Sequence, residues 1–245
     1  MKPGMTLMIL AGSAEARALG VSASQMGFKL RALVSEPPRG TNPMPMPCTL
    51  MTFEDVDAVM AQMRDCDAVL DASHGFDGVM TRVGHEAAQR LGLPFLSYVR
   101  PGWSLPTHAP WNTALDTAAA MPMIAQGARV FSATGWASLP DYAAFPGARL
   151  MLRQTHVHPR TPPFDFVDLI FGDPPFTVQS ETELFGDLHA DTLICRNLGG
   201  LASRPKLDAA LASNMKVILI DRPILPPDVT SVDDLDAALA WLTSL

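Results

Sequence analysis

The feature that most constrains the fold is an apolar run at residues 7–10, which stops at Gly12 and is followed at once by Ser13, a typical helix-capping residue. Four consecutive apolar residues predict a buried strand, and the glycine permits a tight turn into a helix. The exposed N–H groups at the start of such a helix attract anions. Only Gly12 stands where the dinucleotide-binding fingerprint has three glycines. The motif by itself therefore supports a phosphate-binding turn and a plain strand-to-helix turn equally.

Strand and helix patterns alternate through the first hundred residues, which predicts a parallel sheet covered by helices. A proline-rich stretch at residues 36–47 interrupts the alternation and is expected to be a surface loop. The expected strands cover residues 7–10, 29–34, 68–71 and 95–99, and the expected helices cover residues 14–26, 52–64 and 79–91.

The strand-then-glycine pattern recurs at residues 129–135, after a proline-containing linker at residues 104–110. We therefore expect an α/β fold of two Rossmann-like parallel-sheet domains facing each other across a cleft. Residues 1–105 would form the dinucleotide-binding domain, and residues 106–245 would form a second domain that completes the cofactor and substrate cleft. Its further strands are expected at residues 149–154, 192–196 and 217–221, and its helices at 138–145, 182–188, 206–213 and 232–242.

Composition excludes several classes of protein. The net charge of -7 and the lack of a Lys/Arg block argue against nucleic acid as a partner. No apolar run approaches the roughly 18 residues that a membrane-spanning helix needs. The N-terminus lacks the pattern of a signal peptide, so a cytoplasmic protein is expected. Cys48, Cys66 and Cys195 have neither the number nor the spacing of a disulfide framework or metal site, and no metal is expected.

Five segments of the chain carry a resemblance when they are read together: residues 9–17, 69–76, 98–103, 131–135, and 196–200 together with 206–210. They resemble the precorrin-6A reductases of cobalamin biosynthesis, called CobK or CbiJ. The resemblance runs from about residue 7 to residue 226, in the order and spacing of that family. It implies NADPH-dependent reduction of one double bond in the ring-contracted tetrapyrrole precorrin-6A, giving precorrin-6B, without flavin or metal.

The cofactor interpretation can be compared with the residues at the expected end of the second strand. NAD-binding folds place an acidic residue there, whereas this chain has Ser35, about 20 residues after Gly12. A neutral serine with Arg39 nearby favours NADP(H), although Ser35 could merely begin the proline-rich loop and Arg39 could be solvated. The other expected cofactor contacts are Gly12, Ser13, Ala14, Glu15, Arg17, Ser73, His74, Thr134, Gly135, Asn197, Gly199 and Gly200.

Four side chains are catalytic candidates: His74, Tyr142 and Lys206 could polarise or protonate the substrate, and Asp77 could steady a developing cation on the tetrapyrrole. Each has a plainer interpretation. A single histidine is more often structural, Asp77 could cap a helix, and solvent could supply the proton. The anionic tetrapyrrole also needs cationic partners, for which Arg153, Arg204 and Lys206 are candidates, with surface solvation as the alternative.

Two competing functions remain open at this stage. A short-chain dehydrogenase would require Tyr-x-x-x-Lys, but Pro146 stands four residues after Tyr142. A noncatalytic nucleotide- or tetrapyrrole-binding protein could keep the phosphate turn without transferring hydride. Besides its substrate, the protein is expected to make transient contacts with neighbouring pathway enzymes.

Overall fold

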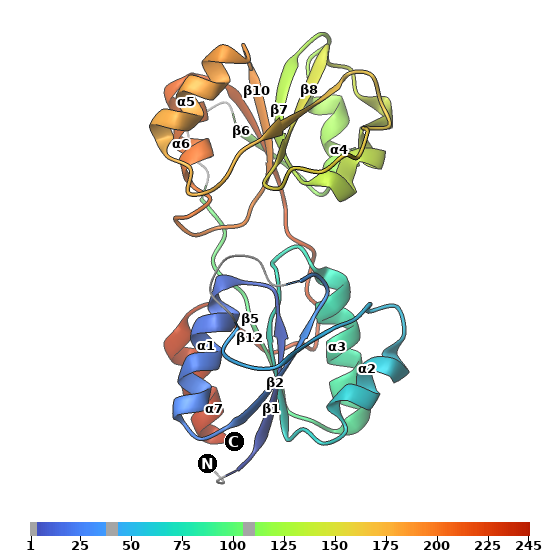
Figure 1. Cartoon of the computed structure of the whole chain (residues 1–245), viewed down its shortest axis with the longest axis vertical. Coiled ribbons are helices and arrows are strands. Elements are labelled where there is room, and N and C mark those ends of the chain that lie inside the picture. Colours follow the sequence, from blue (N-terminus) through green and yellow to red (C-terminus); the bar gives the residue numbers. More distant parts are fainter. Residues whose placement is uncertain (1–3, 38–43, 105–110) are drawn as a thin grey trace. The chain divides into compact units, whose positions relative to one another are not determined.

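The computed structural model describes residues 4–37, 44–104 and 111–245. The chain forms two compact units: Met1–Arg100 with Pro223–Leu245, and Pro101–Arg222 (Figure 1). This division corrects the expected one, in which residues 106–245 formed a single second domain. The last 23 residues belong to the first unit because Ala238 and Leu242 are buried in its core.

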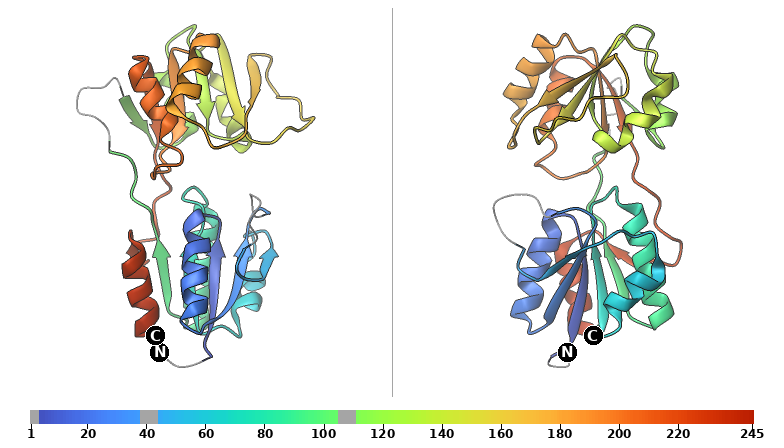
Figure 2. Two further views of the ribbon diagram at one scale, coloured as in Figure 1. Left: turned by 60° about the vertical axis from the view of Figure 1, so that its left-hand side comes forward. Right: turned by 45° about the vertical axis from the view of Figure 1, so that its right-hand side comes forward.

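The first unit contains a six-stranded parallel sheet with helices on both faces. Its strand order is β12-β5-β4-β1-β2-β3. Figures 1 and 2 show α1 and α7 on one face and α2 and α3 on the other. The strands are β1 (Thr6–Ala11), β2 (Lys29–Val34), β3 (Cys48–Leu50), β4 (Ala68–Ala72), β5 (Phe95–Tyr98) and β12 (Ser231–Val232), and the helices are α1 (Ala14–Gln25), α2 (Val56–Met63), α3 (Gly78–Leu91) and α7 (Leu235–Ser244).

The second unit repeats this plan with the order β6-β11-β10-β7-β8-β9, again all parallel. Helices α5 and α6 cover one face, and α4 lies on the other (Figure 1). The strands are β6 (Trp111–Ala114), β7 (Arg129–Ala133), β8 (Arg149–Gln154), β9 (Val167–Phe171), β10 (Thr192–Arg196) and β11 (Lys216–Ile220); the helices are α4 (Thr117–Ala120), α5 (Val178–Asp187) and α6 (Pro205–Ala212), with 3-10 segments η1 (Met121–Met123) and η2 (Trp136–Ala144).

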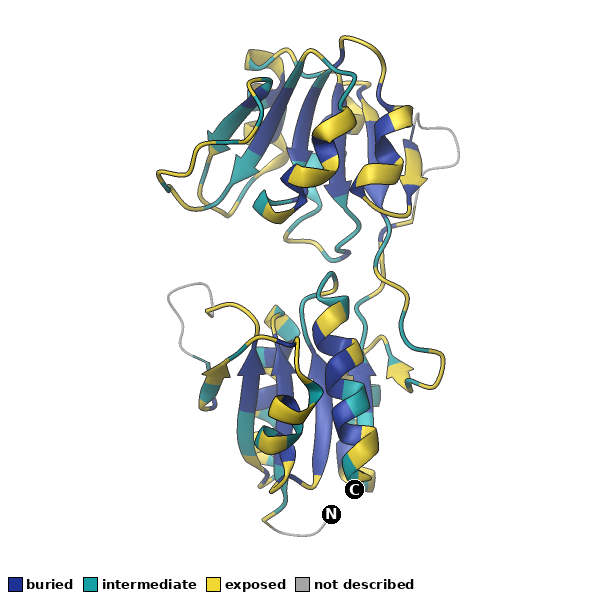
Figure 3. Cartoon of the chain, turned by 90° about the vertical axis from the view of Figure 1, so that its right-hand side faces the viewer, coloured by how far each residue is buried: buried dark blue, intermediate teal, exposed yellow. Residues whose placement is uncertain are grey.

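The two parallel-sheet α/β units confirm the predicted fold class, and the central strands lie close to where the sequence predicts them. Figure 3 shows these strands buried in both sheets, while the helices expose their outer faces. The differences occur at the sheet edges. The short strands β3, β6, β9 and β12 were not predicted, and the expected helix at residues 138–145 is a 3-10 segment that contains Pro140.

Each sheet has one point at which the strand order reverses. Successive strands run outward from β1 through β2 to β3, whereas β4 and β5 lie on the other side of β1. In the second sheet, β7 and β10 have the same relation. Open parallel sheets bind ligands at the carboxyl ends of the strands that flank such a point. The β1/β4 and β7/β10 crevices are therefore where each unit is expected to bind a ligand.

Candidate functional site

At the β1/β4 point, two turns pack backbone against backbone. Ser13 caps α1: its hydroxyl accepts from the Ala16 N–H at 3.2 Å and donates to the Ala72 carbonyl at 2.9 Å. A Cβ placed on Gly12 would lie 2.7 Å from the backbone nitrogen of His74. The glycine is therefore needed for close approach to the turn after β4. The predicted cap is confirmed, and it fixes the start of α1 beside the end of β4.

The start of α1 is suited to an anion. Gly12 and Ala14 are exposed, and the positive end of a twelve-residue helix lies there. Glu15 in the first turn would repel an anion, but Arg100 pairs with both of its carboxylate oxygens. Burial alone would raise the pKa of Glu15; the hydrogen bonds and charge of Arg100 outweigh it and lower that pKa. Arg17, one turn further on, is half-buried.

The turn after β4 is held from below by a carboxylate that the sequence analysis did not single out. Asp71 is buried and accepts from the Ser73 N–H at 3.0 Å and from the Thr81 and Ser97 hydroxyls at 2.8 Å each. Burial raises the pKa of Asp71. The Ser73 hydroxyl lies 3.1 Å from that of Thr81, so this network also engages Ser73. His74 Nδ1 accepts from a backbone N–H, which leaves its proton on Nε2.

Asp77 and Ser35 meet at the end of β2. Asp77 caps α3 by accepting from the Met80 N–H at 3.1 Å, and the Ser35 hydroxyl donates to the same carboxylate. The capping interpretation of Asp77 thus matches the geometry. The carboxylate lies beside the residue expected to contact the ribose. Arg39, the expected partner of a 2′-phosphate, lies outside the described residues.

The β7/β10 point is built differently. After β7, the chain enters η2 without a side-chain cap, and Gly135 has a φ of 85°, a conformation that favours glycine. Below this turn, the Tyr142 hydroxyl lies 2.9 Å from that of Ser132 and 3.1 Å from that of Thr134. Tyr142 has no exposed surface, and burial raises its pKa to about 12.

Two expected roles are therefore corrected. Tyr142 cannot present a proton to a substrate, because its hydroxyl is enclosed in the core network. Thr134, expected to offer its backbone N–H to the cofactor, is 1% exposed and donates that N–H to the Ser132 hydroxyl at 3.4 Å, while its own hydroxyl bonds to Ser138 at 2.6 Å, so neither group is available to a cofactor. Gly135 remains half-exposed at the surface of this turn.

The loop after β10 supports neighbouring segments. The Asn197 side chain accepts from the Trp103 N–H at 2.8 Å, and the Trp103 indole N–H donates to the Gly200 carbonyl at 2.9 Å. A Cβ on Gly199 would lie 1.9 Å from the Pro101 carbonyl oxygen. Asn197, Gly199 and Gly200, which were expected to contact the cofactor, therefore hold the segment that enters the second unit.

The same loop also holds the segment that leaves the second unit. The Arg222 Nε–H donates to the Asn197 carbonyl at 2.8 Å, and a terminal N–H of the same guanidinium donates to the Leu198 carbonyl at 2.7 Å. The two connections between the units, at Arg100–Pro101 and Arg222–Pro223, therefore both adjoin segments fastened to this loop.

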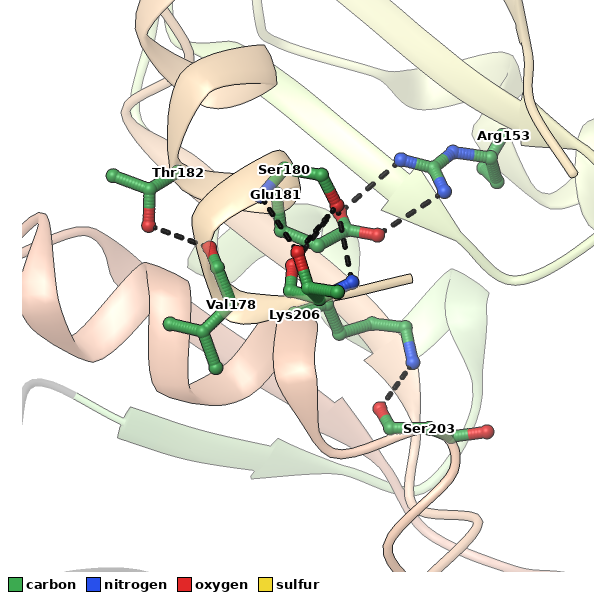
Figure 4. A network of polar contacts seen from close by, with 8 residues as sticks. Arg153, Val178, Ser180, Glu181, Thr182, Ser203 and Lys206 are labelled. Atoms are coloured by element: carbon green, nitrogen blue, oxygen red, sulfur yellow. Dashed lines mark hydrogen bonds and ion pairs between the residues drawn. The ribbon is translucent and has the colours of Figure 1, made fainter. Parts of the chain in front are cut away.

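Arg153 does not fit its expected role in binding the substrate. Its two terminal nitrogens each donate to one oxygen of Glu181 at 3.1 Å, and the two side chains are 9% and 1% exposed (Figure 4). The guanidinium also lies over the rings of Phe131 and Phe176, at 5.0 and 4.1 Å from their centroids. The guanidinium is therefore satisfied inside the protein and is withdrawn from the substrate contacts.

Lys206 is the expected cation that stays available. Its ammonium donates to the Ser203 carbonyl at 2.5 Å (Figure 4). It also lies 5.7 Å from the centroid of a Trp103 ring. Within the part of the chain that the structure describes, Ser203 supplies its one hydrogen-bond acceptor. An ammonium has three donors, so two are left for a ligand. Burial lowers the pKa of Lys206. Arg204, in contrast, is paired with Asp208 at 2.7 Å.

Sequence reasoning missed Asp71, Trp103 and Glu181. A signal for Glu181 exists: it lies one helical turn before Phe185 on the buried face of α5, where an unpaired carboxylate would be costly. A carboxylate on an apolar helical face indicates a buried cationic partner, but it does not say which one.

Comparisons with known proteins agree along almost the whole chain. The model of the family described as precorrin-6x reductase CbiJ/CobK matches residues 6–243. A precorrin-6A reductase of Rhodococcus erythropolis is 32% identical over 98% of both chains, and one of Mycobacterium tuberculosis is 31% identical over the same shares. A solved structure described as CobK precorrin-6A reductase superposes with a TM-score of 0.87 at 28% identity, covering 98% of this chain and 96% of that one.

Among residues 4–37, 44–104 and 111–245, no helix has both the length and the hydropathy to cross a membrane. The same ranges bring together no group of three or more His, Cys, Asp or Glu side chains that could hold a metal ion.

Proposed function

The chain belongs to the precorrin-6x reductase family, CbiJ/CobK, and on that premise we propose that it reduces precorrin-6A to precorrin-6B in cobalamin biosynthesis, using NADPH. The observation that carries the proposal is the match to precorrin-6A reductases over 98% of the chain, through both units. When bound, NADPH supplies the hydride for one double bond of the tetrapyrrole. The protein's own residues bind and orient the two reactants.

The β1/β4 crevice fits a dinucleotide. The close packing of Gly12 against His74 leaves the Ser13-capped start of α1 exposed for a pyrophosphate, with Ala14 beside it. Arg100 neutralises Glu15 there, and Arg17 adds a positive charge. At the ribose end, the Asp77 carboxylate opposes a 2′-phosphate. The preference for NADPH over NADH therefore rests on the family and on the prediction made for Arg39 from the sequence.

The β7/β10 crevice fits the carboxylates of the substrate. We assign Lys206 to bind one of them or to polarise the conjugated system, because two of its three donors have no acceptor among the described residues. Gly135 presents backbone at the same edge of the sheet, and Arg204 contributes charge while paired with Asp208. His74, with its proton on Nε2, is proposed to polarise the substrate by donating a hydrogen bond, while solvent supplies the proton.

The test is anaerobic oxidation of NADPH by the purified protein with precorrin-6A, followed at the nicotinamide absorbance and in the tetrapyrrole spectrum. NADH serves as the parallel cofactor. Stoichiometric loss of NADPH together with a shift in the tetrapyrrole spectrum is the expected result. Tight NADPH binding without oxidation would overturn the proposal in favour of a noncatalytic nucleotide- or tetrapyrrole-binding protein. A His74→Gln variant with full activity would show that His74 does not polarise the substrate.

A further inference from the structure

Three ionisable side chains from three different elements gather in one region of the second unit. Arg153 comes from β8, Glu181 from α5 and Lys206 from α6 (Figure 4). The pair of Arg153 and Glu181 is bidentate, so one guanidinium occupies both carboxylate oxygens. Lys206 lies beside this pair, yet it donates to the Ser203 carbonyl.

The buried pair is an expensive arrangement. Moving the two charges out of water costs several kcal/mol per ion after relaxation. The attraction between the two ions offsets roughly that cost and little more. The Nε–H of Arg153 is buried and lacks a hydrogen-bond partner among the described residues. Apolar side chains of similar volume would often stabilise such a core as well or better. Stability alone is therefore a weak reason for Arg153 and Glu181 to be here.

The charge of Lys206 depends on the same groups. Desolvation by burial is the largest influence on its pKa and lowers it. The facing groups with an electrostatic effect are the Cys195 thiol on β10 and Glu181, which raise that pKa, and Arg153, which lowers it. Without Arg153, Lys206 would be the cation left for the Glu181 carboxylate in this cluster.

We propose that Arg153 is a positioning residue for Lys206: by occupying both oxygens of Glu181, it prevents the carboxylate from capturing the ammonium, which stays at Ser203 and the Trp103 ring, free to bind a carboxylate of the substrate. This inference rests on the proposed function of Lys206. Glu181 would bind the Lys206 ammonium if its oxygens were free, and Arg153 prevents this by occupying both of them. Neither Arg153 nor Glu181 touches the substrate.

The arrangement predicts an unusual order of activity among variants of Arg153 and Glu181. Arg153→Met leaves Glu181 unpaired, and the carboxylate draws Lys206 into an ion pair. The double variant Arg153→Met/Glu181→Gln removes the competitor too, so Lys206 returns to its place. The double variant is therefore expected to be more active than the single one, opposite to the usual accumulation of damage.

Two measurements test this order. The first is the labelling rate of Lys206 by an amine-reactive reagent, read by mass spectrometry, which needs no substrate. The second separates KM for precorrin-6A from kcat. In Arg153→Met, labelling should slow and KM should rise, each by roughly tenfold, the effect of losing one charge-assisted contact. Both values should return to within about threefold of the parent in the double variant.

A matched control is Arg149→Met, which removes a half-exposed arginine from the same strand; it pairs with Asp168 at 3.4 Å and donates to the Asp165 carbonyl at 2.8 Å. It should change neither readout. Where Arg153→Met fails to fold, Glu181→Gln alone still tests the coupling. Removing the carboxylate leaves two neighbouring cations, which lowers the pKa of Lys206 and speeds its labelling.

Unchanged labelling of Lys206 in Arg153→Met, or a double variant no better than the single one, would overturn the inference. Failure of the proposed function looks different. In that case the parent protein would not turn over precorrin-6A, while the labelling rates would still follow the predicted order.

Discussion

The β1/β4 and β7/β10 crevices occupy equivalent places in two sheets of the same design, but they offer different groups to an anion. In the first, Ser13 caps a twelve-residue α-helix. In the second, the chain after Gly135 enters a 3-10 segment without a side-chain cap, and the hydroxyls that could have faced a ligand are buried around Tyr142. The strand order determines where a ligand binds, and the first turn after the strand determines which ligand it is.

The charged side chains near the two crevices also differ. The first crevice has acidic residues nearby that are all engaged, with Glu15 paired to Arg100 and Asp71 bonded to hydroxyls and an N–H. The anion site that we propose there consists of backbone N–H groups and the positive end of the helix dipole. The second crevice has Lys206, a side-chain cation with donors to spare. Backbone turns suit a pyrophosphate, whereas side-chain cations suit carboxylates around a macrocycle.

The largest expected effect comes from Gly12→Ala. The new Cβ would lie 2.7 Å from the His74 backbone nitrogen and force the two turns apart. We expect NADPH affinity to fall by about a hundredfold, roughly 2.7 kcal/mol, measured by fluorescence titration. The matched control is Gly186→Ala, because a Cβ at Gly186 has nothing within 4 Å. Equal effects of the two substitutions would break the contrast between the crevices.

Lys206→Met tests the other crevice. KM for precorrin-6A should rise by about tenfold while the Kd for NADPH stays within about twofold, since one charge-assisted contact is lost. Lys206 must be protonated to hold a carboxylate, and burial lowers its pKa below 10.5. KM of the parent should therefore begin to rise at a pH below that value. Lys216→Met, at an exposed position of β11, is the control; a weakened NADPH affinity in Lys206→Met would contradict the assignment.

Tyr142→Phe separates a structural hydroxyl from a catalytic one. Removing the buried hydroxyl should lower the free energy of unfolding by about 1 kcal/mol, because Ser132 and Thr134 lose a partner. Chemical denaturation measures this loss. The activity of the folded variant should stay within about twofold of the parent, well under 1 kcal/mol. A large loss of kcat without a loss of stability would restore Tyr142 as a proton donor.

Asp77→Asn is expected to have the smallest effect, and it tests the proposed ribose end of the β1/β4 crevice. Asparagine also caps helices, so α3 should keep its start. Removal of the charge next to Ser35 should strengthen NADPH binding by about threefold, a screened charge effect below 1 kcal/mol, and leave NADH binding unchanged. Parallel titrations with both cofactors measure the difference. Equal gains for NADPH and NADH would place the 2′-phosphate away from Ser35.

The sequence predicted local features well because local chemistry decides them. The Gly12–Ser13 turn and the central strands follow from apolar runs, glycine and a capping hydroxyl. The edge strands could not be predicted in the same way. The four residues Trp111–Ala114 of β6 and the two residues of β12 pair with strands distant in the chain, and their own pattern carries no periodicity.

The roles of side chains could likewise be predicted where they depend on local chemistry, and not where they depend on the folded structure. The capping role of Asp77 was among the alternatives because a cap is a local property. The burial of Tyr142 and the pairing of Arg153 with Glu181 depend on elements that meet only after folding. A tyrosine or arginine near a strand end looks equally reactive in the sequence whether it faces solvent or lies inside a core.

The return of the chain to its first unit has a consequence for how the protein is made. A ribosome delivers residues 1–100 first, but this unit still lacks β12 and α7 while residues 101–222 emerge. The middle of the chain can thus complete its sheet before the beginning can. Because α7 packs against α1, the first unit is started first and finished last, and until α7 is made, part of its apolar core stays uncovered.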